Sequence, residues 1–298
     1  MQQDPARRTR ARGKDSHVRL DVLLVQRGLA PSRERAQALI MAGRIRVNGA
    51  AVSKSGTSVP LDATCELSEL APELRYASRG GLKLERALDA FALDPTGLVC
   101  MDVGASTGGF TDVLLRRGAQ RVYAIDVGRG QLAWTLRTDP RVVVMDKTNV
   151  RYLNALPEHA QCAVIDVSFI SLRLVLPAVT QLMGGPGWIV GLVKPQFEAG
   201  KAEADRGSGV ISDPAIHRRV LAELREFAQF LPAPGASTFH LVPRGLIASP
   251  IAGREGNREY LLWLEWADGV SADSPVTDAL IAETVREAFG TESPVHES

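Results

Sequence analysis

The sequence has few cysteines, no long apolar run and almost no net charge. Its three cysteines are odd in number and far apart, which excludes a disulfide framework and a cysteine metal cluster and favours a reducing cytoplasm. No apolar run reaches the roughly 18 residues that span a bilayer, and no apolar stretch follows the arginines near the start. We therefore expect neither a membrane anchor nor a signal peptide. With 298 residues, 45% hydrophobic and 23% charged, the composition is that of a soluble globular protein with room for two domains.

The net charge of +1 hides a division of charge along the chain. Residues 1–60 hold twelve Lys or Arg against four Asp or Glu, a net of +8, whereas the remainder carries −7. A basic N-terminal region followed by an acidic remainder indicates that the N-terminal region binds a polyanion, although a solvated basic tail would give the same net charge.

The basic N-terminal region divides into a tail and a small module. Residues 1–17 are polar and basic with little to bury, so we expect them to be disordered. Helices are predicted over Val18–Arg27 and from the N-cap Ser32 to about Ala42. Asn48-Gly49 between two strand-like runs predicts a hairpin, because both central positions of a type I′ turn need positive φ. The module ends near residue 70.

Beyond a linker over 71–79, strands and helices alternate, starting with a helix opened by Gly80-Gly81. Five apolar segments lack clean alternation, which is typical of parallel strands buried on both faces. The pattern predicts an α/β fold, a doubly wound Rossmann-like sheet over 80–268, with a C-terminal helix and tail over 269–298. The expected parallel strands are Leu98–Val103, Arg121–Asp126, Val142–Met145, Cys162–Val167 and Trp188–Lys194, and an antiparallel edge is expected from Thr238–Val242 and Glu259–Trp266.

The first of these strands runs into a glycine-rich loop that could hold a nucleoside cofactor. Glycines let the backbone approach a ligand at a helix N-terminus, although many strand-to-helix turns use glycine for geometry only. An acid about 20 residues later can accept hydrogen bonds from both ribose hydroxyls. The pyrophosphate pattern G-x-G-x-x-G is absent, which favours S-adenosylmethionine (SAM) over a dinucleotide. The expected cofactor contacts are Asp102, Gly104, Ser106, Thr107, Gly108, Gly109, Phe110, Asp126 and Asp146.

Two further polar residues, Asp166 and Lys194, end expected strands. The carboxyl ends of strands line the ligand crevice of an open α/β sheet, so both are site candidates, with a structural ion pair as the alternative. Taken alone, Lys83 and Glu259 are typical of solvated surface positions.

Several separate motifs, in order along the chain, resemble the TlyA family, whose members are often labelled hemolysins. The resemblance implies an S4 RNA-binding domain over 18–70 and a catalytic domain of the FtsJ/RrmJ type. It also implies SAM-dependent 2′-O-methylation of ribosomal RNA, at cytidine in small-subunit RNA, large-subunit RNA or both. The motifs are DVGASTGGFTD (102–112), IDVGRGQL (125–132), DVSFIS (166–171), VKPQFE (193–198), GVISD (209–213), SPI (249–251) and GNRE (256–259).

The resemblance also implies a catalytic Lys-Asp-Lys-Glu tetrad, which falls on Lys83, Asp166, Lys194 and Glu259, although Glu255 lies only four residues from Glu259. Lys194 would act as a neutral base or as a cation that stabilises the alkoxide, with Asp166 orienting it. Lys83 and Glu259 would hold the ribose. No metal is expected. The arginines expected to contact RNA phosphates are Arg19, Arg33, Arg35, Arg44 and Arg46.

Three other functions remain open at this point. A non-catalytic RNA-binding or ribosome-assembly protein could hold SAM without transferring its methyl group. A membrane-active hemolysin would need a membrane element, which the sequence lacks. Methylation of a base or a protein is disfavoured by the two site lysines and by the absence of an Asn-Pro-Pro-Tyr-type loop. We expect ribosomal RNA or ribosomal subunits as partners.

Overall fold

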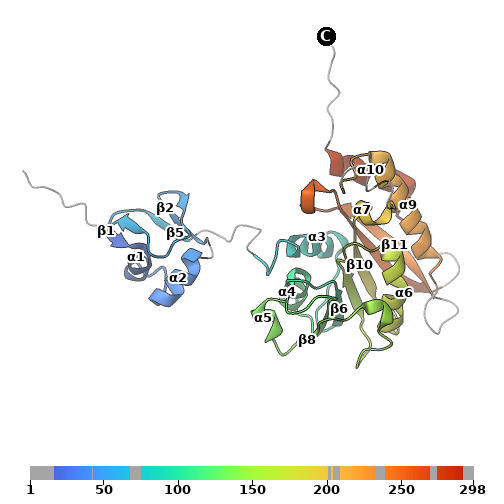
Figure 1. Ribbon diagram of the computed structural model, residues 1–298, viewed down its shortest axis with the longest axis horizontal. Helices are drawn as coiled ribbons and strands as arrows, with labels where there is room; N and C mark the ends of the chain where they lie inside the picture. The colour runs from blue at the N-terminus through green and yellow to red at the C-terminus, as the bar shows by residue number, and fades with distance from the viewer. Residues whose placement is uncertain are drawn as a thin grey trace, which may run out of the picture. The chain divides into compact units, whose positions relative to one another are not determined.

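The computed structural model describes residues 17–41, 43–67, 75–200, 203, 209–231, 239–268 and 274–290. The chain divides into two compact units, Met1–Arg75 and Tyr76–Ser298 (Figure 1). The tail expected to be disordered lies outside the described residues except for His17, as do residues 71–74 of the expected linker. Within the described ranges, no helix is long and apolar enough to cross a membrane.

The first unit is a small α+β module. Its two helices pack on one another and on short strands around a core that includes Leu20, Leu24, Ile40 and Ile45. β1 pairs with β4, and the order β3-β2-β5 forms a second sheet. The elements are β1 (His17–Arg19), α1 (Leu20–Gln26), α2 (Arg33–Met41), β2 (Ile45–Val47), β3 (Ala50–Ala51), β4 (Ser58–Pro60) and β5 (Cys65–Leu67).

In this unit the predicted hairpin and helix N-cap, which depend only on residues close together in the sequence, are confirmed. Asn48 and Gly49 have φ of 50° and 80° and join β2 to β3, as the hairpin prediction requires. Ser32 Oγ accepts a hydrogen bond from Arg35 N at 3.2 Å, as expected of an N-cap. The helix expected from Val18 is wrong at its start, because Val18 pairs with Val59 in the β1–β4 ladder. A contact between residues so distant in the chain overrides local helical periodicity.

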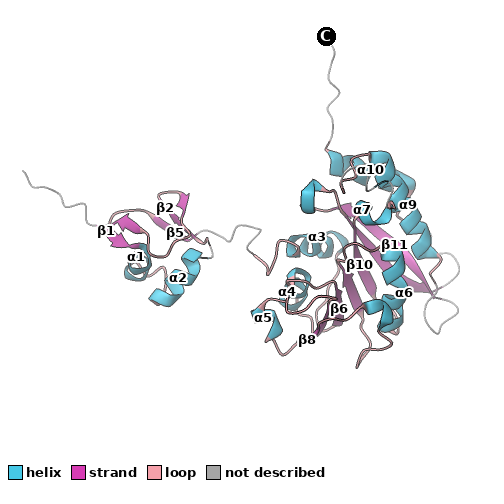
Figure 2. Cartoon of the chain, viewed as in Figure 1, coloured by secondary structure: helices cyan, strands magenta, loops and turns pink. Residues whose placement is uncertain are grey.

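The second unit is built on a seven-stranded sheet with the order β11-β12-β10-β9-β6-β7-β8 (Figure 2). Five strands are parallel and β12 runs antiparallel to both β10 and β11, so the predicted doubly wound α/β sheet with an antiparallel edge is confirmed. The strands are β6 (Val99–Val103), β7 (Arg121–Ile125), β8 (Val142–Met145), β9 (Cys162–Ile165), β10 (Trp188–Val193), β11 (Phe239–Ala248) and β12 (Tyr260–Asp268).

Helices cover both faces of the sheet, as Figure 1 shows. Because side chains alternate along a strand, Met101 of β6 joins the core under α6, α9 and α10, whereas Cys100 joins the core under α3, α4 and α5. The remaining elements are α3 (Gly81–Phe91), α4 (Gly109–Arg116), α5 (Trp134–Arg137), η2 (Val150–Tyr152), α6 (Leu172–Met183), α7 (Pro195–Glu198), α9 (Pro214–Gln229), η3 (Arg254–Gly256) and α10 (Asp278–Phe289).

β11 is longer than the sequence predicts. The expected strand ends at Val242 because Pro243 and Gly245 are typical of a loop, but the strand continues to Ala248 with a register shift between those two residues. β11 lies at the edge of the sheet, where a proline removes no hydrogen bond to a second neighbour.

Candidate active site

The register of the parallel strands brings three loops to one edge of the sheet. Val103, the last residue of β6, pairs with the last residues of β7 and β9. The loops that begin at Gly104, Asp126 and Asp166 therefore leave the carboxyl edge at the same level. This is the edge at which an open α/β sheet binds its ligand.

The antiparallel strand adds an acid from the C-terminal part of the chain. Val193 of β10 pairs with Tyr260 of β12. Lys194 follows Val193 and Glu259 precedes Tyr260, so both residues also lie at the carboxyl edge. No local pattern around Glu259 could predict this, because it depends on the direction of β12.

The four residues of the expected tetrad form two ion pairs with little exposure to solvent. Lys194 Nζ lies 2.6 Å from Asp166 Oδ1 and donates a hydrogen bond to Ser168 Oγ at 2.9 Å. Lys83 Nζ pairs with Glu259 Oε2. Both lysine side chains are 9% exposed, and Asp166 is the most open of the four at 25%. Removing one partner of such a pair would leave a poorly solvated charge behind.

The first turn of α3 joins the two ion pairs. A Cβ on Gly80 would lie 4.0 Å from Asp166 Oδ2, so the start of α3 packs beside one pair. Lys83, three residues later, supplies the cation of the other pair. The structure thus brings all four residues together. The competing position Glu255 is exposed in η3 with a φ of 58°, whereas Glu259 is 4% exposed.

The glycines of the loop after β6 permit close packing of three segments. Gly104 has a φ of 89°, and a Cβ there would lie 2.9 Å from the carbonyl carbon of Asp166. A Cβ on Gly109 would lie 2.9 Å from the backbone nitrogen of Gly81. Part of the glycine pattern is therefore explained by the approach of the loop to β9 and α3, and these contacts hold it beside the ion pairs.

Asp102, at the end of β6, is fully buried and incompletely hydrogen-bonded. Oδ2 accepts a hydrogen bond from Thr111 Oγ1 at 2.6 Å, whereas Oδ1 has no partner. Burial raises the pKa of Asp102 to about 7. A buried acceptor without a partner fits a ligand that donates a hydrogen bond or carries a positive charge.

The other two acids assigned to the cofactor hold loops. Asp126 accepts hydrogen bonds from the backbone nitrogens of Ser106 at 2.8 Å and Gly128 at 2.6 Å, and so ties the glycine loop to the end of β7. Asp146 pairs with Arg137 at 2.7 Å, and this guanidinium lowers the pKa of the Asp146 carboxyl. Both carboxylates lie at the edge of the sheet and are half-buried.

Four residues of the loop after β6 differ in the groups that they can offer a ligand. Ser106 and Thr107 are exposed, with Ser106 at a φ of 46°. Phe110 is 3% exposed and packs in the core under α4, so its side chain is not available and only its backbone could contribute. Gly108 has a φ of 95°, and a Cβ there would lie 2.8 Å from Leu132 Cδ1.

Three residues near Lys194 were not among those expected from the sequence. Phe169 is 89% exposed and has a φ of 64°, which is strained for a residue with a side chain. Its ring centroid lies 5.0 Å from that of Phe197, and Lys194 Nζ lies 6.0 Å from the Phe197 ring. Ser168, two residues after Asp166, could have been found from its place beside a strand end. An aromatic ring held open to solvent could not.

In the first unit, a buried acid orders two of the expected RNA-binding arginines. Asp21 is fully buried and pairs with Arg19 at 2.9 Å and Arg33 at 3.2 Å. The Arg19 guanidinium holds the pKa of Asp21 well below its usual range. Arg35 is exposed, and Arg46 is exposed and donates to Gly49 O at 2.9 Å. Arg44 is half-buried.

Comparison with known proteins agrees with this architecture. The family model described as FtsJ-like methyltransferase matches residues 76–266, and that of the S4 domain matches residues 18–64. YqxC from Bacillus subtilis is 44% identical over 279 residues, which cover 92% of this chain and 94% of YqxC. The Mycobacterium tuberculosis 16S/23S rRNA (cytidine-2′-O)-methyltransferase TlyA is 48% identical over 249 residues, 83% of this chain and 89% of TlyA. A solved structure from Streptococcus thermophilus, 41% identical, covers 92% of this chain and 96% of its own with a TM-score of 0.67.

The sheet and the extent of the first match define an FtsJ-like methyltransferase that carries an S4 domain. YqxC and TlyA each match this chain over most of its length, so the similarity extends beyond the catalytic domain. The chain belongs to the TlyA family, and the resemblance seen in the sequence motifs is confirmed.

Proposed function

We propose that this chain transfers the methyl group of SAM to the ribose 2′-OH of cytidine in ribosomal RNA, in the small subunit, the large subunit or both. The observation that carries the proposal is the pair of contacts Lys194–Asp166 and Lys83–Glu259 at the edge where the Gly104 loop begins. A ribose hydroxyl must lose its proton as it attacks, and a fixed lysine can accept that proton or stabilise the charge left behind. The relative TlyA is named for the same reaction.

The residues at the end of β6 and β7 fit SAM as the methyl donor. Asp102 Oδ1 is a buried acceptor without a partner, which suits the ammonium of an amino acid. Asp126 would accept hydrogen bonds from the ribose hydroxyls, and the Gly104 loop would admit the ligand close to its backbone. Asp146 would lie on the nucleoside side of the site. When bound, SAM supplies an activated methyl group.

Each residue of the tetrad has a separate task in the proposed mechanism. Lys194 Nζ acts at the proton of the 2′-OH, either as a neutral base or as a cation beside the developing alkoxide. Asp166 and Ser168 fix the position of that nitrogen through their contacts at 2.6 and 2.9 Å. Lys83 and Glu259 hold the ribose, and positioning of this kind can lower a barrier by about 7 kcal/mol or more.

The aromatic pair near Lys194 offers a surface for the target base. Phe169 projects into solvent and contacts Phe197, which lies close to Lys194. Stacking of a base on an aromatic side chain is worth about 1–3 kcal/mol. A cytidine stacked there would present its ribose to the tetrad.

The S4 unit supplies general affinity for RNA. Its arginines contact phosphates, so binding weakens steeply as salt concentration rises. Folded A-form RNA hides its base edges in a narrow major groove, so this unit recognises shape and backbone. Ribosomal subunits in the cytoplasm are the proposed partners.

Incubation with labelled SAM and isolated ribosomal subunits tests the proposal. Nucleoside analysis of the recovered RNA should yield 2′-O-methylcytidine. Label on a base, label on ribosomal protein or no transfer would overturn it. The pH dependence of a single turnover bears on the two roles of Lys194. A rate that rises to a plateau fits a neutral base, and its midpoint belongs to the coupled group.

A further inference from the structure

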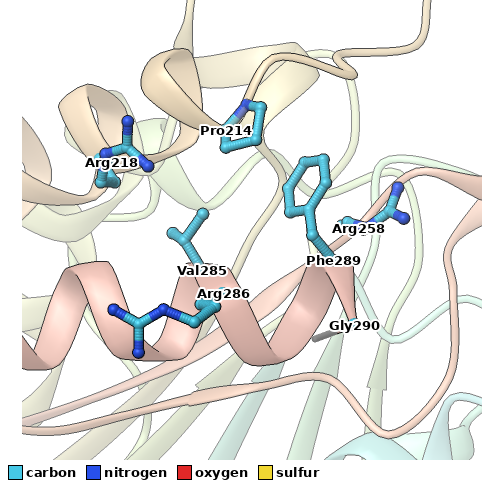
Figure 3. Close-up of a pocket in the computed structure, with 7 residues that line it drawn as sticks. All are labelled: Pro214, Arg218, Arg258, Val285, Arg286, Phe289 and Gly290. Carbon is cyan, nitrogen blue, oxygen red and sulfur yellow. The ribbon is translucent and has the colours of Figure 1, made fainter. Parts of the chain in front are cut away.

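A pocket of about 460 Å³ lies between α9, α10 and the turn before β12, away from the glycine loop. Figure 3 shows its lining, which combines arginines with an apolar floor from Val285 and Phe289. No acidic side chain of the described residues lines it. We call it the arginine pocket, after Arg218, Arg258 and Arg286.

Two of its arginines lack the partners that their neighbours have. On the same helix as Arg218, Arg219 pairs with Glu223 at 3.0 Å and Arg225 pairs with Asp278 at 2.6 Å. Among the residues that the structure describes, Arg218 and Arg286 make no ion pair and no side-chain hydrogen bond. Like charges around one hollow repel each other, and an anion in the hollow would remove that cost.

The third arginine is fixed in place. Arg258 Nε donates a hydrogen bond to the Ala288 carbonyl at 2.8 Å, and its guanidinium lies 3.9 Å from the centre of the Phe289 ring. In Figure 3, Phe289 lies between Arg258 and the other two arginines. The charged groups therefore border the hollow from both sides of this ring.

Arg258 also connects this pocket to the active site. A second hollow of about 220 Å³ is lined by both Arg258 and Glu259, together with the Ser249–Ala252 segment. Glu259 belongs to the tetrad through its pair with Lys83. The arginine pocket and this second hollow therefore share Arg258, and the second hollow extends to Glu259, which is proposed to hold the ribose.

We infer that the arginine pocket binds a backbone phosphate of the substrate RNA close to the nucleotide being methylated. The inference rests on the proposed function. A ribose held at the tetrad carries phosphates on both sides, and these must cross the adjoining surface. A guanidinium group presents two parallel N–H donors that match two phosphate oxygens, whereas a lysine ammonium lacks this paired geometry. The pocket is a phosphate contact of the catalytic unit itself, in addition to the arginines of the S4 unit.

The salt dependence of binding to protein-free ribosomal RNA tests this inference. Each phosphate contact that is lost lowers the slope of log K against log salt concentration by about 0.7–0.9. We expect Arg218→Ala/Arg286→Ala to reduce that slope by about 0.7–0.9, the amount for one phosphate contact, and to weaken binding about 10-fold at low salt. Arg258 is left unchanged because it holds the end of α10.

A double variant elsewhere on the sheet serves as the control. Arg121→Ala/Arg141→Ala removes the same charge at the starts of β7 and β8, the edge opposite the active site. Its salt slope should stay within about 0.3 of the wild type, well below the effect of one phosphate contact. Unchanged SAM binding by both double variants shows that the catalytic unit is folded.

Three results would overturn the inference. The first is an unchanged salt slope for Arg218→Ala/Arg286→Ala. The second is stabilisation of the wild type, but not of this variant, by inorganic phosphate with equal RNA slopes, which indicates a site for a free anion. The third is a loss confined to intact subunits, which indicates contact with a ribosomal protein. Methyl transfer by the wild type is measured separately, so a failure of the proposed function is distinguished from a failure of this inference.

Discussion

The backbone of Asp166 packs directly against Gly104, so that a Cβ on Gly104 would lie 2.9 Å from the Asp166 carbonyl carbon. Gly104 begins the loop assigned to the cofactor, and Asp166 belongs to the tetrad. This contact places the loop assigned to the methyl donor and the lysine–carboxylate pairs at one edge of the sheet. A side chain added at Gly104 would therefore disturb this arrangement without removing any polar group.

Gly104→Ala should damage both stability and cofactor binding. A side chain at a φ of 89° is strained and has no room beside Asp166, so we expect a loss of about 2–4 kcal/mol in unfolding free energy. Denaturant unfolding and calorimetric titration with SAM measure the two effects. Gly97→Ala is the matched control, since Gly97 has a φ of 72° with nothing within 4 Å and should lose only about 1 kcal/mol. Equal losses in both variants would contradict the close contact.

Asp102 should make the protein less stable as the pH rises towards neutrality. Burial raises its pKa from 3.8 to about 7, so between these values the folded protein keeps a proton that the unfolded chain has released. Stability contributed by this group therefore falls across that window, by an amount on the order of a few kcal/mol. Urea unfolding of the wild type and Asp102→Asn at about pH 5 and pH 8 measures the difference. The variant cannot ionise at this position, so its dependence on pH should be flatter, and parallel curves would refute the assignment.

Two neighbouring arginines of the S4 unit should respond differently to charge reversal. Arg33→Glu sets a carboxylate beside the buried Asp21, so it should lower the stability of the first unit by about 2 kcal/mol and weaken RNA binding. Arg35→Glu should weaken RNA binding with little loss of stability, because Arg35 is exposed on the helix surface. Thermal unfolding and ribosomal RNA affinity are measured for both. If Arg35→Glu binds RNA as the wild type does, its assignment to RNA contact is wrong.

Phe169→Gly should separate stability from activity. The substitution relieves a φ of 64° and exposes no core, so we expect stability to be unchanged or about 1 kcal/mol higher. Loss of the stacking surface should raise KM for the RNA about 10-fold while SAM affinity is retained. Phe230→Gly, at another exposed phenylalanine in the second unit, controls for the removal of a surface ring. An unaltered KM for Phe169→Gly would rule out a role in holding the base.

Much of this fold follows from local patterns in the sequence. Four of the five parallel strands are largely buried, the edge strand β8 is half-buried, and the apolar runs mark all five to within one or two residues. The helix expected within residues 269–298 is present as α10. Asp166 and Lys194 could be found because the end of a parallel strand is a defined place in such a sheet.

What the sequence could not provide depends on contacts between distant segments. The hydrogen-bond ladder between Val18 and Val59 converts a helical pattern into a strand, and an edge position lets β11 continue through Pro243. Phe110 was expected to contact the cofactor, but its side chain is buried in the core. Phe169 was not expected in the site, but its ring is exposed beside the end of β9. Glu259 needed either the family resemblance or the antiparallel register of β12 to be chosen over Glu255.

In the proposed mechanism Lys194, fixed by Asp166, acts on the proton of a ribose hydroxyl. The most direct measurement is single-turnover methyl transfer to ribosomal subunits by Lys194→Ala at saturating SAM, with SAM affinity determined on the same preparation. We expect transfer to fall about 100-fold or more while SAM still binds. Transfer at nearly the wild-type rate would exclude the role assigned to Lys194.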